Sequence, residues 1–179
     1  MNNRLKKLIN IITRNIIKPL VYVNGETYTK LMVSYLKSNG MNIIGDPYYL
    51  SSSIYFDGSD YSLITLEDGC SISRDVFFLT HDFSRNTVYK GLELKNKKEL
   101  ERQYEETRLR SLKPIRVGAN TFIGARAFIL PGANIGSNVL IGAGSVVRGT
   151  IPDNSIVMGN PAIVVKKTSE WLEQQIFEE

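Results

Sequence analysis

The stretch VGANTFIGARAFILPGANIGSNVLIGAGSVV, residues 117–147, repeats with a period of six. An aliphatic residue stands at every sixth position, and a small or β-branched residue follows each one four positions later. The period fits neither an α-helix nor the simple alternation of a strand. It predicts a coil with three flat faces, one hexapeptide to a face and about eighteen residues to a turn. The aliphatic positions are Val117, Ile123, Ile129, Ile135, Ile141 and Val147, and the small ones are Thr121, Ala127, Ala133, Val139 and Ser145.

Glycine directly follows four of the aliphatic residues, at Gly118, Gly124, Gly136 and Gly142. This place lies near a corner of the predicted coil, where glycine can adopt a positive φ without steric cost. We therefore expect aliphatic side chains inside the coil and glycines at its corners. The repeat alone predicts an architecture, and it leaves open a protein that only binds or scaffolds.

Residues 123–147 and the segment IPDNSIVMGNPA, residues 151–162, closely resemble the hexapeptide-repeat acyltransferases. The likeness is greatest to the sugar O- and N-acetyltransferase branch, related to maltose, galactoside and serine acetyltransferases, and it extends back through residues 40 to 83. The resemblance implies a mainly β protein built as a left-handed parallel β-helix. It also implies a homotrimer, acetyl-coenzyme A as the donor and a histidine base. The left hand, an exception among crossover connections, comes from the resemblance and not from the spacing.

The composition excludes several classes of protein. The chain has 179 residues, of which 42% are hydrophobic and 22% charged, with a net charge of +4. This fits one domain with a real core, and the charge is too mild and scattered for a nucleic-acid-binding protein. The single cysteine, Cys70, favours a reducing compartment and a buried structural thiol. No signal peptide and no membrane span are expected, so the predicted location is cytoplasmic.

The chain divides into an N-terminal helical segment (1–40), a β-helix (41–165) with an inserted loop (82–114), and a C-terminal helical tail (166–179). Residues 4 to 20 read as a basic amphipathic helix with an apolar stripe. Such a helix can lie on the inner face of an anionic membrane. The alternative, which we favour, is that the stripe packs on the coil or on a neighbouring subunit. The stripe comprises Leu5, Leu8, Ile9, Ile12, Ile16 and Leu20.

A second helix is predicted over residues 26 to 38, and Asn39 and Gly40 form its stop. Its expected apolar contacts are Leu31, Val33, Tyr35 and Leu36. A terminal helix capped by Thr168 is expected to dock through Trp171, Leu172 and Ile176.

The first coils, residues 41 to 80, show a looser repeat. One phase of six contains Ile54, Leu66, Ile72 and Phe78, with Asp60 as a misfit. The later repeat is displaced from this phase by three positions, which requires an insertion. Residues 82 to 114 supply it, and we expect this long loop to shape the acceptor pocket.

His81 is the only histidine. It follows an apolar strand and stands at the start of the inserted loop, where a neutral imidazole could act as a general base. The segment of residues 79 to 82 resembles the catalytic histidine segment of the family. Asp82 either orients the imidazole or binds the acceptor, or else it only begins an Asx turn. One histidine cannot supply the three zinc ligands of the carbonic anhydrases built on the same coil, so no metal is expected.

The donor site is implied by the resemblance. The family holds the pantetheine arm in a groove between coils of two subunits, where small residues let the backbone be approached. Phe122 takes the place of an aromatic residue beside the thiol end, whereas Arg148 stands where several relatives have threonine. Pro161, Lys166 and Lys167 match the segment that meets the adenine and its phosphates. The small residues are Gly124, Ala125, Gly142, Ala143 and Gly144, and corner geometry alone is the alternative explanation for the glycines.

These residues predict direct transfer of an acetyl group from acetyl-coenzyme A to a sugar or glycan hydroxyl. No G-x-S-x-G motif is present, which disfavours a covalent acyl-enzyme. The alternatives are N-acetylation of an amino sugar or sugar nucleotide, and a non-catalytic β-helix scaffold.

Overall fold

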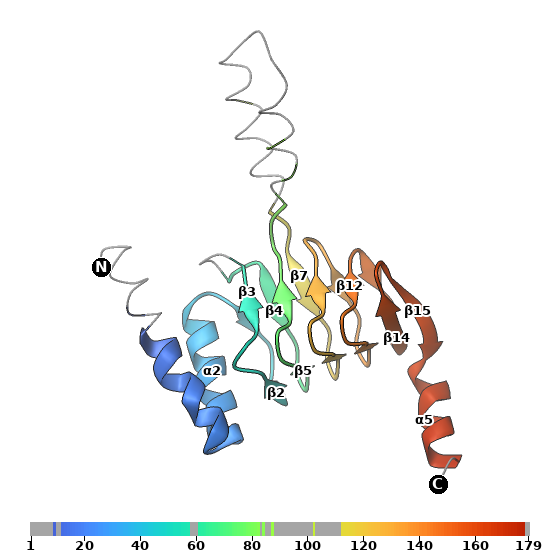
Figure 1. Cartoon of the computed structure of the whole chain (residues 1–179), viewed down its shortest axis with the longest axis horizontal. Coiled ribbons are helices and arrows are strands. Elements are labelled where there is room, and N and C mark those ends of the chain that lie inside the picture. The colour runs from blue at the N-terminus through green and yellow to red at the C-terminus, as the bar shows by residue number, and fades with distance from the viewer. Residues whose placement is uncertain are drawn as a thin grey trace.

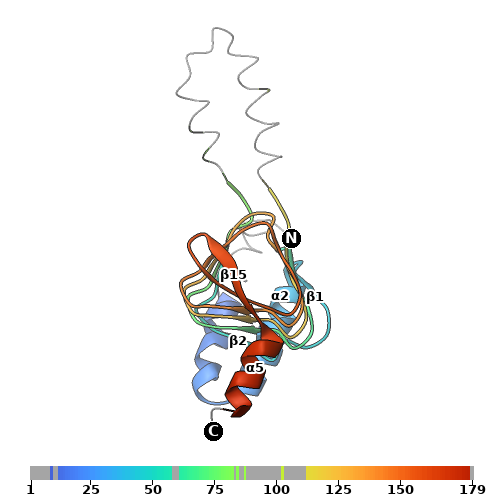
Figure 2. The same ribbon diagram turned by 90° about the vertical axis from the view of Figure 1, so that its right-hand side faces the viewer.

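The computed structural model describes residues 12–57, 61–82 and 112–177, together with the single positions 9, 84, 87 and 102. Parallel strands, most of them two or three residues long, stack in three sheets and form a left-handed parallel β-helix. Figure 1 shows the coils side by side, with α2 at one end and α5 at the other, and Figure 2 looks along the coil. The centre of the inserted loop and the misfit Asp60 lie outside the described residues.

The strands follow one another around the three sheets in turn. The first sheet contains β1 (Asn42–Ile43), β4 (Ile64–Leu66), β7 (Ile115–Val117), β10 (Asn134–Ile135) and β13 (Thr150–Ile151). The second contains β2 (Tyr49–Leu50), β5 (Ser71–Ile72), β8 (Phe122–Ile123), β11 (Leu140–Ile141), β14 (Ser155–Gly159) and the antiparallel β15 (Ala162–Lys167). The third contains β3 (Tyr55–Phe56), β6 (Phe77–Phe78), β9 (Phe128–Ile129) and β12 (Val146–Val147).

The interior confirms the period of six. Val117 pairs with Ile135, eighteen residues later, and Ile123 pairs with Ile141 at the same spacing. All six aliphatic positions and all five small positions of the repeat are buried. Cys70 is one of the buried small residues, and burial raises the pKa of its thiol to about 12.

The glycines after the aliphatic positions serve a purpose other than the predicted one. None of the four has a positive φ. A Cβ on Gly118 would come within 2.5 Å of the Gly136 backbone, and one on Gly124 within 2.6 Å of the Ala143 nitrogen. Their role is therefore close stacking of successive coils. The left-handed residue stands two positions further on, at Asn120, Arg126, Asn138 and Gly144.

The predicted phase of the first coils is wrong at Ile54. Phe56, not Ile54, stacks on Phe78, because β3 pairs with β6 in that register. Ile54 is buried two residues earlier, in the place that small residues take in the later coils. His81 and Leu112 form an antiparallel bridge across the base of the expected insertion, which was predicted over residues 82 to 114.

The helices occupy the ends of the coil. Residues 12 to 17 are helical and lead into the 3-10 helix η1 (Lys18–Tyr22), and α2 spans Gly25–Ser38. Asn24 caps α2, because its Oδ1 accepts a hydrogen bond of 2.9 Å from the Thr27 backbone N–H. Gly40, with a φ of 94°, follows the end of α2 as predicted. The C-terminal helix α5 (Thr168–Phe177) begins at the predicted residue.

The predicted contact faces of all three helices need correction. In α2 the buried residues include Tyr28 and Met32, whereas Leu31 is exposed. In the N-terminal helix Ile17 is buried, and the described stripe residues Ile9, Ile12 and Ile16 are exposed. In α5 the expected docking residues Leu172 and Ile176 are exposed as well. Other members of the predicted faces do pack on the same chain: Tyr35 and Leu36 of α2 are buried in the core, and the stripe residue Leu20 packs against it.

Tyr28 offers a stability test. Its hydroxyl is buried with no hydrogen-bond partner among the described residues, and burial raises its pKa. Because a buried unsatisfied hydroxyl costs about 1–3 kcal/mol, we expect Tyr28→Phe to raise the free energy of unfolding by about 1 kcal/mol in urea denaturation. Tyr35→Phe is the control, since the Tyr35 hydroxyl bonds to Tyr61 and its loss should bring no gain. A less stable Tyr28→Phe protein would contradict the expectation.

Candidate active site

His81 lies where the coil opens into the inserted loop. It follows β6 by three residues and forms the bridge with Leu112 that closes the base of the loop. The Lys113 backbone N–H donates a 2.9 Å hydrogen bond to the Thr80 carbonyl and holds the two strands of this base together. The imidazole is 30% exposed. It is therefore both anchored by the backbone and accessible to a ligand.

The carboxylate of Asp57 pairs with the imidazole. Asp57 directly follows β3, and its backbone N–H donates to the Phe78 carbonyl at 3.0 Å. This register places its Oδ2 against Nδ1 of His81, and the same oxygen accepts a 3.3 Å hydrogen bond from the Thr80 N–H. The Asp57 side chain is only 7% exposed. In a neutral imidazole that donates Nδ1–H to this carboxylate, Nε2 carries the lone pair and is the nitrogen that can accept a proton.

Asp57 is not among the site residues predicted from the sequence. The register of β3 with β6 places Asp57, one residue after Phe56, beside the segment from Leu79 to His81 that follows Phe78. Assigning Ile54 to the wrong phase concealed it. Asp82 is exposed, and its Oδ1 accepts a hydrogen bond of 2.9 Å from the Ser84 N–H, as in the predicted Asx turn. The carboxylate beside Nδ1 in the described structure is thus that of Asp57.

Three of the predicted donor residues meet in one apolar groove. Phe122, Gly142 and Lys166 line a hollow of about 600 Å³ on the outer face of the second sheet. Met158 of β14 and Trp171 of α5 complete its walls. Such a groove can hold an apolar arm with a charged end beside the lysine.

The other predicted donor residues lie elsewhere. Gly124 is buried and Ala125 is half-buried, whereas Ala143 and Gly144 are exposed at the same corner of the next coil. Lys167 lines a different hollow, because successive residues of β15 point to opposite sides of the strand. Arg148 is exposed after β12, and Pro161 is exposed in the turn between β14 and β15.

His81 and the groove belong to different faces of the coil. His81 follows the third sheet, whereas Phe122 and Gly142 belong to the second. Within one chain, therefore, a base and a binding groove are present on separate sheets.

The described part of the chain contains no group of three or more His, Cys, Asp or Glu side chains arranged to hold a metal ion. Among the same residues, no helix is long and apolar enough to cross a membrane.

The comparisons with known proteins agree with the repeat. The model of the bacterial transferase hexapeptide (six repeats) matches residues 114–149. A putative acetyltransferase of Saccharomyces cerevisiae, YJL218W, is 46% identical over 68 residues, which cover 36% of this chain and 35% of that protein. The chain thus spans about a third of the length of this relative.

Two other likenesses extend over most of the chain. The putative lipopolysaccharide biosynthesis O-acetyl transferase WbbJ of Escherichia coli is 27% identical over 143 residues, 80% of this chain and 70% of that protein. The structure of a galactoside acetyltransferase in complex with coenzyme A superposes with a TM-score of 0.51 at 19% identity, over 93% of this chain and 84% of that one. The latter likeness concerns the fold.

Proposed function

Because the chain belongs to the hexapeptide-repeat acyltransferase family, we propose that it transfers an acetyl group from acetyl-coenzyme A to a hydroxyl of a sugar or glycan precursor. The observation that carries the proposal is the pairing of His81 with the buried Asp57 carboxylate at the edge of the coil. An imidazole oriented in this way has one nitrogen available for proton transfer. The names of the relatives support the acetyl group and the class of acceptor.

The reaction follows from the tautomer in which Nδ1 carries the ring proton and Nε2 can accept one. The acceptor oxygen attacks the thioester carbonyl carbon while Nε2 of His81 takes the hydroxyl proton. The resulting oxyanion is stabilised by backbone N–H groups near the site. The carbon–sulfur bond then breaks, the thiolate leaves with the electron pair, and the imidazolium returns the proton to it. Asp57 stabilises the imidazolium and fixes the ring orientation.

The site needs a second copy of the chain, since His81 and the groove lie on different sheets. We therefore propose a homotrimer in which the base of one protomer faces the groove of the next. An apolar column on the third sheet supports this assembly. Tyr55 and Phe77 have ring centroids 5.5 Å apart, Phe77 and Phe128 4.8 Å apart, and the outer rings remain exposed in one chain. Sedimentation equilibrium tests the trimer, and a monomer active at all concentrations would exclude it.

Trp171 allows a test of the donor groove. Replacing it with alanine removes one wall, so we expect KM for acetyl-coenzyme A to rise about tenfold, with a smaller change in kcat. Leu172→Ala is the matched control, because Leu172 is exposed and does not line this groove. Steady-state kinetics at varied concentrations of acetyl-coenzyme A distinguish the two variants. An unchanged donor KM in Trp171→Ala would place the donor elsewhere.

The proposed reaction is tested by release of the coenzyme A thiol in the presence of acetyl-coenzyme A and mixed sugar acceptors. Product analysis by mass spectrometry separates an O-acetyl ester from the amide that the alternative, N-acetylation, would form. Thiol release no faster than in buffer with any acceptor would favour the scaffold instead.

A peripheral membrane contact is a further part of the proposal. Ile12 and Ile16 of the N-terminal helix are exposed in the single chain, and Ile16 is 67% exposed. Together with the basic residues of positions 4 to 20, they suit an anionic lipid surface. Flotation with phosphatidylserine vesicles tests the contact, and flotation that is unchanged by deleting this helix would exclude it.

A further inference from the structure

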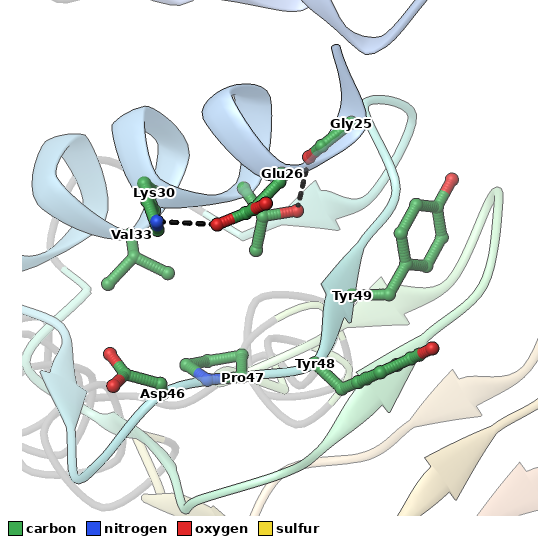
Figure 3. Close-up of a pocket in the computed structure, with 9 residues that line it drawn as sticks. Gly25, Glu26, Lys30, Val33, Asp46, Pro47, Tyr48 and Tyr49 are labelled. Carbon is green, nitrogen blue, oxygen red and sulfur yellow. Dashed lines mark hydrogen bonds and ion pairs between the residues drawn. The ribbon is translucent and has the colours of Figure 1, made fainter.

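A second hollow lies far along the chain from His81, between α2 and the segment that leads into β2. Its volume is about 770 Å³, within the range of pockets that hold small ligands. Figure 3 shows Glu26, Lys30 and Val33 on the helical side, facing Asp46, Pro47 and the two tyrosines on the other. The pocket is thus formed by two elements that pack at the first turn of the coil.

Two aromatic side chains line this pocket without packing on other rings. Tyr48 is 82% exposed, and neither Tyr48 nor Tyr49 makes a ring contact with another aromatic residue of the described structure. Aromatic side chains commonly line pockets that hold small ligands. Aromatic faces bordered by polar groups suit the C–H faces and hydroxyls of a sugar ring.

The charges of the pocket argue for a ligand without negative charge. Glu26 and Lys30 form an ion pair of 2.6 Å. Asp46 stands opposite, its backbone N–H donating 2.8 Å to the Asp68 carboxylate. The carboxylate of Asp46 has no cationic partner of its own among the described residues, so the lining carries one net negative charge. Phosphates and acidic sugars would be repelled, whereas hydroxyl groups can bond to all three side chains.

The pocket is continuous with the face that carries the donor groove. The outward residues Tyr49, Ser71 and Phe122 stand in register on neighbouring strands of the second sheet. Tyr49 borders the pocket and Phe122 borders the groove. We propose that the pocket binds an uncharged sugar segment of the acceptor, away from the hydroxyl that is acetylated. This inference rests on the proposed function, because it assumes a glycan acceptor.

Direct binding tests the proposal without turnover. The full chain, with no acetyl donor, is applied to an array of neutral and acidic oligosaccharides. We expect retention on neutral oligosaccharides that falls about tenfold in Tyr48→Ala and less than about threefold in Tyr48→Phe, which keeps the ring. Tyr22→Ala is the matched control, since Tyr22 is 89% exposed and does not line the pocket. It should bind as the unmodified chain does.

A second variant reverses the charge. Asp46→Lys changes the net charge of the lining from negative to positive and should shift retention toward acidic oligosaccharides. The proposal would be overturned if the unmodified chain is retained on no neutral oligosaccharide or prefers acidic sugars. It would also be overturned if Tyr48→Ala is retained as well as the unmodified chain. The two proposals fail separately. If the chain acetylates small sugars yet is not retained on the array, only the proposal for the pocket fails. If it is retained but never releases thiol, only the proposed acetyltransferase activity fails.

Discussion

Replacing His81 with alanine is expected to lower kcat/KM for acetyl transfer by about 10²–10⁴-fold, the usual contribution of a general base. The acceptor hydroxyl would then have to lose its proton to bulk water instead of to a positioned base. The measurement is thiol release at saturating acetyl-coenzyme A with the best sugar acceptor found in the mixed assay.

His81→Asn separates the chemistry from the structure. Its amide can still donate to the Asp57 carboxylate, so the base of the inserted loop should keep its contacts, but the amide cannot accept the acceptor proton. We expect it to lose as much activity as His81→Ala while it melts close to the unmodified protein. Full activity in both variants would show that another group is the base.

Asp57→Asn is expected to have the second largest effect, a fall in kcat of about 10–10³-fold. The amide can turn its NH₂ group toward Nδ1 of His81, which would move the ring proton to Nε2 and remove the free lone pair. Loss of the negative charge also destabilises the imidazolium that forms during transfer. Thiol release at saturating substrate concentrations measures this fall in kcat.

Asp82→Asn is the matched control for this pair of carboxylates. Its amide oxygen can still accept the Ser84 N–H hydrogen bond of the Asx turn. We expect less than about a threefold change in kcat. A larger loss in Asp82→Asn than in Asp57→Asn would transfer the orienting role to Asp82.

The proposed assembly and membrane contact would together explain several exposed apolar side chains. These are Ile9, Ile12 and Ile16 of the N-terminal helix, Leu172 and Ile176 of α5, and Tyr55 and Phe128 on the third sheet. A sequence pattern reports that a face is apolar, because burial selects the residue type. It does not report whether the covering surface comes from the same chain, from a second copy or from lipid.

The hexapeptide period was sufficient to predict the coil, its core positions and the point of insertion before residue 115. A local repeat of this kind specifies its own fold, because each turn packs only on the turns beside it. The same locality explains the partial success in the first coils. There the spacing between buried residues is uneven. The sequence pattern alone therefore does not show whether Ile54 or Phe56 takes the aliphatic position of the repeat.

What the tertiary structure alone decided is how residues far apart in the chain meet. Asp57 and His81 are 24 positions apart, and their contact depends on the parallel register of β3 with β6. The stacking role of Gly118 and Gly124 likewise depends on backbone atoms of the following coil. The repeat determined the path of the chain, because side-chain volume and burial act locally. The partner of the histidine and the reason for the glycines come from distances between coils, which no single hexapeptide contains.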